Sequence, residues 1–332
     1  MLESRPDPAF QWMTRLAREH PGIFGRGGGW KVSSLKEPQV SSHSTRLFKV
    51  DGTVVHVKYF SRTLGHTGAT YRPAREMEAE YRALKTFEER GFTSGRYQVV
   101  RALGYDEKSD CALATLFVEG ESLLSLIAGA IDGERSEADL FMGLELAAGL
   151  LKKIHDVMPQ SFGIDHCEMF YSYLKALLNL EGRDALSGYH RRIMKALARW
   201  QDSRPLLDQR GVTVHGDANP SNFKIREGII YAFDVERSRP RRSRCVDLGA
   251  MVAELTHQFA YLGRDAARAG PFIGHFLRAY EPLDRERKRI EQILPFYTSQ
   301  SLLKIAMLGY WNGAHRRFLV EEGARQIEVP PR

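Results

Sequence analysis

The spacing of apolar residues predicts a strand-rich segment over residues 31–118. Arg46–Val50 and Thr53–Phe60 read as strands, and the Asp51-Gly52 pair between them is a strong hairpin signal. Two more strands are expected near Gln98–Tyr105 and Cys111–Val118, joined by turn-forming residues. Between the two pairs of strands, a helical pattern covers residues 74–90 and ends before Gly91.

Beyond Gly120 the apolar residues follow a helical period. Helices are expected over Leu140–His155, Glu168–Leu180 and Tyr189–Trp200, and again from Val246 onward. One β-like island, Val212–Asp234, interrupts them. The pattern therefore predicts an α+β protein of two lobes, a small antiparallel β-sheet lobe followed by a larger, mainly helical lobe. The boundaries follow from it: an N-terminal extension over 1–30, which carries a helix over Pro8–Arg18, an N-lobe over 31–118 and a C-lobe over 119–332, with Phe117–Gly120 as the hinge.

Composition narrows the class of protein only slightly. The 332 residues are 43% apolar and 27% charged, which is ordinary for a globular chain that needs no disulfides or metal to fold. The three cysteines are far apart, the N-terminus is not a secretory signal, and no apolar run approaches the roughly 18 residues of a membrane span. We therefore expect a cytoplasmic protein. The net charge of +7 favours anionic partners. The sequence has no basic stripe with interleaved aromatic residues, so we do not expect nucleic acid among them.

The β-like island carries the chemistry. It contains His215-Gly216-Asp217 and, five residues after the aspartate, Asn222; a predicted hairpin then ends in Asp234. Phosphoryl transfer needs a carboxylate that accepts the proton of the attacking hydroxyl, and Asp and Asn oxygens suit magnesium. Protein kinases place a catalytic Asp and a metal-binding Asn at the same separation. The island therefore predicts a phosphotransferase centre.

This segment resembles the aminoglycoside phosphotransferase and choline kinase family, which has a protein-kinase-like fold. The resemblance implies that Asp217 is the catalytic base, that Asn222 and Asp234 bind Mg²⁺, and that ATP is the phosphate donor. It covers roughly residues 35–280, and the stretch of about 156–210 corresponds to the family's inserted helices. Asp247, in Asp247-Leu248-Gly249, is expected to bond the backbone around the catalytic loop.

The same resemblance implies nucleotide-binding residues in the N-lobe. Lys58 is the strand lysine expected to reach the phosphates, with Glu80 as its helical partner and Glu76 as the rival. The backbone of Phe117 and Val118 is expected to bind adenine. The phosphate loop should lie near Val40–Arg46, where serines replace the usual glycines; Ser42 and Ser44 are its candidate ligands.

Five arginines in eight residues follow the metal-binding aspartate, and they bear on the acceptor. Arg239, Arg241 and Arg242 are candidates for binding an anionic substrate, because guanidinium groups bind carboxylates and phosphates in a bidentate manner. We therefore expect an ATP- and Mg²⁺-dependent transfer to a hydroxyl of a small molecule, a sugar or an anionic metabolite, rather than to a polycationic aminoglycoside. A lipopolysaccharide-type glycan as acceptor, a catalytically inactive nucleotide-binding scaffold, and the choice between ATP and GTP stay open, as does the oligomeric state.

Overall fold

The structure is a computed structural model that describes residues 8–35, 43–63, 71–182, 185–186, 188–309 and 311–330. The chain divides into two compact units. The first comprises Met1–Glu119 together with Tyr231–Glu236, and the second comprises Gly120–Ile230 and Arg237–Arg332. The division after Glu119 falls inside the expected hinge. Each unit is described separately below.

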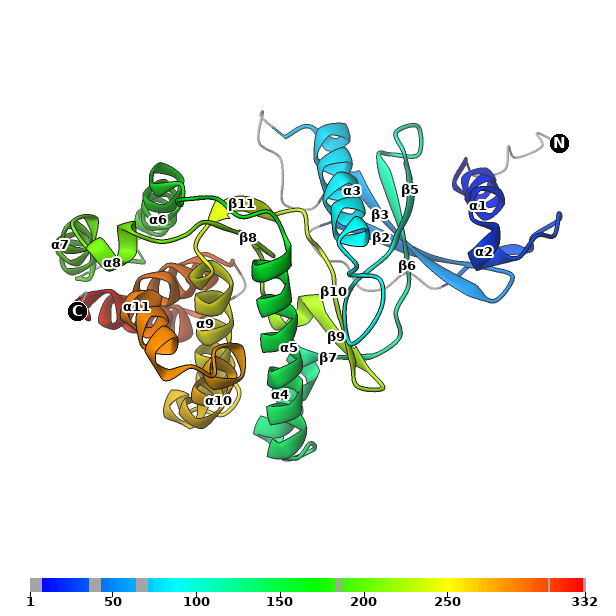
Figure 1. Ribbon diagram of the computed structural model, residues 1–332. Helices are drawn as coiled ribbons and strands as arrows, with labels where there is room; N and C mark the ends of the chain where they lie inside the picture. The colour runs from blue at the N-terminus through cyan, green and yellow to red at the C-terminus, as the bar shows by residue number, and fades with distance from the viewer. Residues whose placement is uncertain are drawn as a thin grey trace. The chain divides into compact units, whose positions relative to one another are not determined.

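An antiparallel sheet forms the centre of the first unit (Figure 1). Its strands follow the order β1-β2-β3-β6-β5, and their bounds are Val32–Ser34, His43–Val50, Thr53–Thr63, Ala112–Leu116 and Ala102–Asp106. The hairpin between β2 and β3 pairs Val50 with Thr53, and both Asp51 and Gly52 have positive φ, as a tight two-residue turn requires. The hairpin predicted from Asp51-Gly52 is thus confirmed. A short strand β4, Tyr97–Val99, precedes β5.

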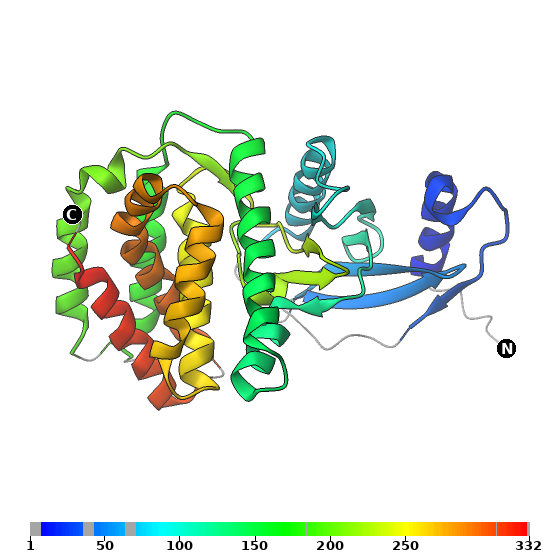
Figure 2. The ribbon, with the colours of Figure 1, turned by 60° about the horizontal axis from the view of Figure 1, so that its bottom comes forward.

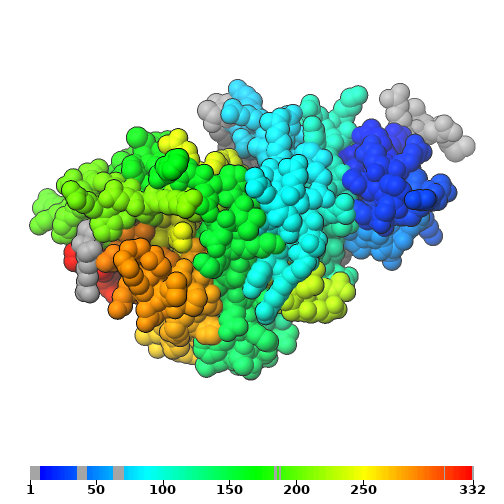
Figure 3. Space-filling model, viewed as in Figure 1, coloured from blue at the N-terminus to red at the C-terminus, as the bar shows by residue number. Residues whose placement is uncertain are grey.

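Helices cover both faces of this sheet. Helix α1, Pro8–Glu19, buries a stripe with helical spacing, namely Ala9, Trp12, Met13, Leu16 and Ala17. That stripe packs with Val55, Val57 and Tyr59 of β3 in one apolar cluster. Successive side chains of a strand point to opposite faces, so Lys58 faces the other side, toward α3, Pro73–Glu89. In Figure 3, α1 and the short α2, Pro21–Phe24, form the dark blue part that lies against the first strands.

Residues 8–24 thus pack against the sheet of the N-lobe. Within them, α1 adds its apolar stripe to the core of the sheet, and Phe24 of α2 is buried in the same cluster. Two polar contacts hold the helix at the far edge of the sheet. Arg15 pairs with Asp106 at 2.9 Å, and the His20 imidazole bonds the carbonyl oxygen of Leu103 at 2.5 Å. This segment therefore belongs to the core that supports β3 from the face opposite Lys58.

The second unit is mainly helical, and Figure 2 shows several of its helices side by side. The helices are α4 Leu123–Asp132, α5 Glu137–Val157, α6 His166–Glu181, α7 His190–Gln201, α8 Arg204–Leu207, α9 Cys245–Tyr261, α10 Gly270–Tyr280, α11 Asp284–Ala306 and α12 Gly313–Glu328, with 3₁₀ turns η1 Pro220–Asn222 and η2 Ala266–Ala269. Helix α11 packs against α9, α12 and α6, and α5 packs against α10. The predicted insertion of about 156–210 contains α6, α7 and α8. Two buried bonds join it to the C-terminal helices: Tyr173 to Ser299 at 2.5 Å, and Trp200 to the Ile327 carbonyl at 2.8 Å.

Short strands interrupt these helices. Strands β8 Val212–Val214, β9 Phe223–Arg226 and β10 Ile229–Ala232 lie in the predicted β-like island, whereas β7 Glu121–Ser122 and β11 Arg239–Arg242 lie outside it. Strand β7 pairs with β9, and β8 pairs with β11. Strand β11 was not predicted, because its arginine-rich sequence has none of the alternation typical of a strand. None of the helices over the described residues combines the length and the apolar character that crossing a bilayer requires.

Candidate active site

The loop that follows β8 carries the predicted catalytic residues. Its first residue, His215, is fully buried, and Gly216 adopts a φ of 86°, in the region that favours glycine. A Cβ at Gly216 would collide with the backbone carbonyl of Arg237. Only glycine therefore lets the chain turn here with the Arg237 segment packed directly against it. The turn presents Asp217 half-buried at the head of the loop.

A buried carboxylate holds this turn in place. Asp247, at the start of α9, accepts the backbone N–H groups of His215 at 2.7 Å and Gly216 at 2.9 Å. His155 bonds the same carboxylate through Nε2 at 3.0 Å, and its Nδ1 lies 2.8 Å from the hydroxyl of Tyr280. Burial opposes ionisation of Asp247, but the bond from His155 and the neighbouring imidazole and backbone donors lower the pKa of Asp247 overall. Asp247 thus bonds the backbone of the catalytic loop, as predicted from the sequence.

Asp217 and Asn222 are brought together within the loop. The Asn222 amide nitrogen donates to the backbone carbonyl of Asp217 at 3.0 Å, so the amide oxygen is the atom of this side chain that could bind a metal. Between them, Asn219 caps the 3₁₀ turn by accepting the N–H of Ser221 at 2.9 Å. The Asn219 amide nitrogen donates to the buried carboxyl group of Glu254, on α9, at 3.0 Å. The loop is thus attached to α9 at two points, through Asp247 and through Glu254.

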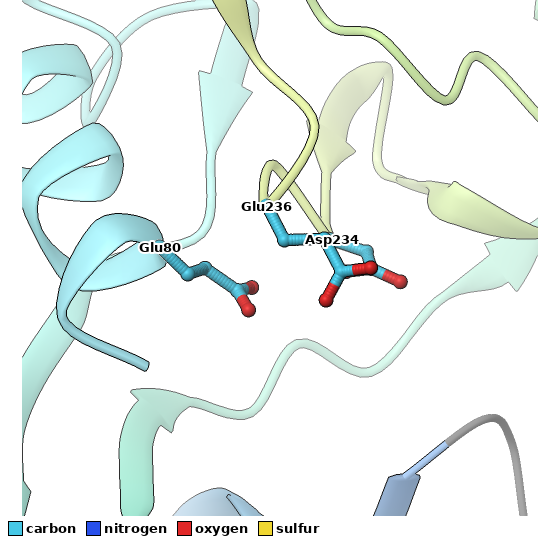
Figure 4. A group of neighbouring side chains, drawn as sticks. All are labelled: Glu80, Asp234 and Glu236. Carbon is cyan, nitrogen blue, oxygen red and sulfur yellow. The ribbon is translucent and has the colours of Figure 1, made fainter. Parts of the chain in front are cut away.

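A second cluster of charged groups lies in the first unit. Lys58 Nζ is 2.9 Å from a carboxylate oxygen of each of Glu80, Asp234 and Glu236. The three carboxyl groups point toward one another (Figure 4), and their nearest oxygens all lie within 4.8 Å of each other. The structure pairs Lys58 with Glu80, the partner preferred over Glu76 from the sequence. It also places Asp234 in the same group, 176 residues away from the lysine.

The electrostatics of this cluster depend on the lysine. Burial opposes the charge on Lys58, but the three carboxylates outweigh burial and raise the pKa of the lysine. Burial raises the pKa of Glu80, and Lys58 offsets that effect only in part. Asp234 has a φ of 54°, an uncommon conformation for a residue other than glycine and one that is often found at functional sites. The atoms of Glu80, Asp234 and Glu236 that could bind a cation are carboxylate oxygens, which suit a hard ion such as Mg²⁺.

The remaining predicted residues lie in several places. Phe117 and Val118 follow β6, and the N–H of Phe117 donates to the carbonyl of Val54 at 3.0 Å. Ser42 lies outside the described residues, and Ser44 belongs to β2, paired with Tyr59, rather than to a loop. The expected phosphate loop over Val40–Arg46 is therefore wrong from His43 onward, because the strand begins there.

The predicted arginines differ in their exposure. Arg239 and Arg241 are exposed, whereas Arg242 is half-buried and pairs with Glu168 of α6 at 3.0 Å. Asn219, Glu236 and Glu254 are among the residues of these clusters that were not predicted as site residues. A sequence signal existed for Glu236 alone, since it stands two residues after the predicted metal-binding aspartate.

Comparison with known proteins adds a family to this geometry. Residues 50–290 match the family model described as the phosphotransferase enzyme family. No curated protein matches the sequence of the chain. A Ralstonia eutropha structure, provisionally assigned as an aminoglycoside phosphotransferase, aligns over 97% of this chain and 99% of its own, with a TM-score of 0.63 and 14% identity.

Two further solved structures illustrate the range of similar proteins. A glucosamine kinase aligns over 97% of this chain and 84% of its own, with a TM-score of 0.60 and 15% identity. An ethanolamine kinase from Plasmodium vivax aligns over 98% of this chain and 91% of its own, with a TM-score of 0.57 and 12% identity. At these identities the likeness establishes the fold alone, and it confirms the predicted two-lobed α+β, kinase-like class. Similar structures in complex with ADP include an aminoglycoside phosphotransferase and a glucosamine kinase.

Proposed function

Because the chain belongs to the phosphotransferase enzyme family, we propose that it transfers the γ-phosphate of ATP to a hydroxyl group of a small molecule. The observation that carries the proposal is the catalytic loop, in which Asp217 and Asn222 are bonded to each other and attached to α9 through Asp247 and Glu254. Such a fixed loop suits a reaction whose catalysis consists mainly of positioning and charge stabilisation.

In this proposal Asp217 orients the acceptor hydroxyl and takes its proton. The hydroxyl oxygen then bonds to the γ-phosphorus, while the bond from that phosphorus to the β–γ bridging oxygen breaks and ADP leaves. Lys58 supplies positive charge to the nucleotide phosphates, and Glu80 keeps it in place. The backbone of Phe117 and Val118 is the candidate partner of the adenine.

Asn222 and Asp234 are the proposed magnesium ligands, and Glu236 is an additional candidate on the first unit. All three offer oxygen atoms, as magnesium prefers. When bound, the metal neutralises charge on the phosphate groups. The contribution of the chain itself is to hold these oxygens: Asn222 through its bond to Asp217, and the two acids through Lys58.

The test is a transfer assay with γ-labelled ATP against a pool of small metabolites. We expect labelled product with the wild-type protein and loss of at least about 10³-fold of the rate in Asp217→Ala, since the variant lacks the general base. Label transfer that persists in Asp217→Ala would contradict the assigned base. ATP binding by calorimetry without transfer to any acceptor would instead support a nucleotide-binding scaffold. Running the assay with GTP and without magnesium tests the donor and the metal.

A further inference from the structure

Three basic side chains of the second unit, those of Lys304, Arg237 and Arg242, lie near one another, and Asp217 is also a neighbour of Lys304. Lys304, on α11, has Arg237, Asp217, Arg242 and Glu168 as its electrostatic neighbours. All of these groups belong to the second unit, so the arrangement does not depend on the first. The acidic neighbours are the catalytic aspartate itself and Glu168, which already pairs with Arg242. Lys304 therefore has two arginines as neighbours, and one of its two acidic neighbours is already paired with one of them.

The packing of α11 explains how Lys304 reaches this position. Tyr297, Gln300 and Lys304 are spaced by three and four residues, so they lie on one face of the helix. Tyr297 donates its hydroxyl to the sulfur of Met169 at 3.1 Å, and Gln300 donates to the Met169 carbonyl at 3.2 Å. This face therefore lies against the first turn of α6. Lys304, one turn further on, lies beside that turn, which also carries Glu168.

Strand β11 and the residues just before it supply the other two cations, Arg242 and Arg237. Its register places Arg239 opposite Val214 and Arg242 opposite Val212, so the strand runs alongside β8, which leads into the catalytic loop. Arg242 turns toward α6 and bonds Glu168 at 3.0 Å. Arg237 lies just before the strand, and its backbone packs against Gly216, next to Asp217. Two elements that are distant in sequence thus bring basic groups to the same place as the proposed base.

Lys304 differs from an ordinary surface lysine. Its side chain is exposed to solvent, and within the described residues its ammonium group forms no ion pair. Desolvation of the ammonium group by neighbouring protein atoms, together with Arg237 and Arg242, nevertheless lowers the pKa of Lys304 to about 8. It stays mostly protonated at neutral pH. A charged group that is accessible yet crowded by other cations is a group suited to receiving an anion.

We propose that the acceptor carries an anionic group, a carboxylate or a phosphate, in addition to the hydroxyl that is phosphorylated, and that Lys304 binds this group together with Arg242 and Arg237. The inference rests on the proposed function, since it assigns the substrate class of the same site. It refines the expectation from the sequence: Arg242 is retained, and Arg237 and Lys304 join it. The exposed Arg239 and Arg241 stay a hypothesis from the sequence alone.

The experiment compares acceptors in matched pairs that differ in one charge: a sugar with its sugar phosphate, and a hydroxy acid with its methyl ester. The wild-type protein is expected to transfer phosphate to the charged member of a pair with the higher kcat/KM. In Lys304→Met, the KM of that acceptor should rise about 10- to 100-fold, as expected for the loss of a charged hydrogen bond, while the KM of ATP stays unchanged. Lys304→Arg should restore most of the affinity. Lys288→Met, which removes an exposed lysine of the same helix, is the matched control.

Three results would overturn the inference: equal or better use of the neutral member of each pair, an unchanged acceptor KM in Lys304→Met, or a rise in the KM of ATP in its place. Failure of the proposed function has a different signature, since no compound would then be phosphorylated in an Asp217-dependent manner. In that event, calorimetric titration of the same charged compounds into the wild-type protein and Lys304→Met tests the anion site by itself. Equal affinity of the two proteins would refute it.

Discussion

Replacing Lys58 by methionine tests how the charged cluster of the first unit is held together. The side chain keeps its length and apolar character, but the only cation among the four bonded groups is lost. Glu80, Asp234 and Glu236 would then share a space in which their nearest oxygens lie within 4.8 Å of one another. We expect the folded state of the first unit to lose stability at neutral pH and to recover it in acid.

The magnitude follows from the burial of the groups. Removing one partner of a buried ion pair costs about 3–5 kcal/mol. Glu80 is 4% exposed and belongs to this class, whereas the side chains of Asp234 and Glu236 are 30% and 17% exposed and retain part of their hydration. We therefore expect a loss near the lower end, about 3 kcal/mol at pH 8.

The sign of the pH dependence is specific. Burial, Asp234 and Glu236 raise the pKa of Glu80, and Lys58 is the group that opposes them. Without Lys58 the folded variant therefore holds a proton on Glu80 that its unfolded chain releases. Its stability then rises as the pH falls from 8 toward 5. In the wild-type protein, Lys58 is charged in both states over this range, because its folded pKa lies above the unfolded value of 10.5. It therefore adds no slope of its own.

Hydrogen exchange measured on peptides from β3 and α3 reports this unit separately from the rest of the chain. The opening free energy of Lys58→Met should fall below that of the wild-type protein at pH 8, and the difference should shrink by at least half at pH 5, after correction for the intrinsic pH dependence of exchange. Lys49→Met removes an exposed lysine of the adjacent strand and should have little effect at either pH. A deficit in Lys58→Met that is equal at pH 5 and pH 8 would refute the reasoning.

Two other predictions concern the second unit. Burial, with a smaller contribution from Asp217, raises the pKa of Glu254 to about 7. The folded state therefore holds a proton that the unfolded chain releases near pH 4.5, and the stability of the wild-type protein falls as the pH rises from 4.5 to 7. Glu254→Gln should flatten that part of the profile in urea unfolding; parallel profiles would contradict the protonated carboxyl. Gly216→Ala should lose stability and phosphotransfer, because its Cβ would collide with the Arg237 carbonyl. Gly228 has a φ of 74° and no atom near the position of a Cβ, so Gly228→Ala should lose only the stability that a left-handed conformation costs, about 1–2 kcal/mol. Equal losses in the two glycine variants would show that the contact with Arg237 is unimportant.

The features predicted from the sequence are those encoded in short segments. The Asp51-Gly52 turn, the helix that carries Glu80 and the loop from His215 to Asn222 each have a local signature in spacing or turn chemistry. Failures occurred where local signals were weak or misleading. The serines at positions 41–44 suggested a phosphate loop, but β2 begins at His43, and Ser44 pairs with Tyr59 inside the strand. Tertiary pairing likewise makes a strand of Arg239–Arg242, whose sequence has no alternation of apolar and polar residues.

The contacts that hold the catalytic loop lie beyond the reach of such patterns, because they join side chains that are far apart along the chain. Asp247 meets the loop backbone across 32 residues, and Glu254 meets Asn219 across 35. Lys304 is further still from Asp217 in sequence, and nothing in its own helix marks it. A lysine followed by apolar residues is typical of any amphipathic helix. What distinguishes Lys304 is that Tyr297 and Gln300 fix its face of α11 against Met169, which brings its charge to α6 and β11. The sequence alone thus suggested the aspartate proposed as the base and Arg242 as a group that binds the acceptor. Lys304 and Arg237 join Arg242 only through the packing of elements that are distant in sequence.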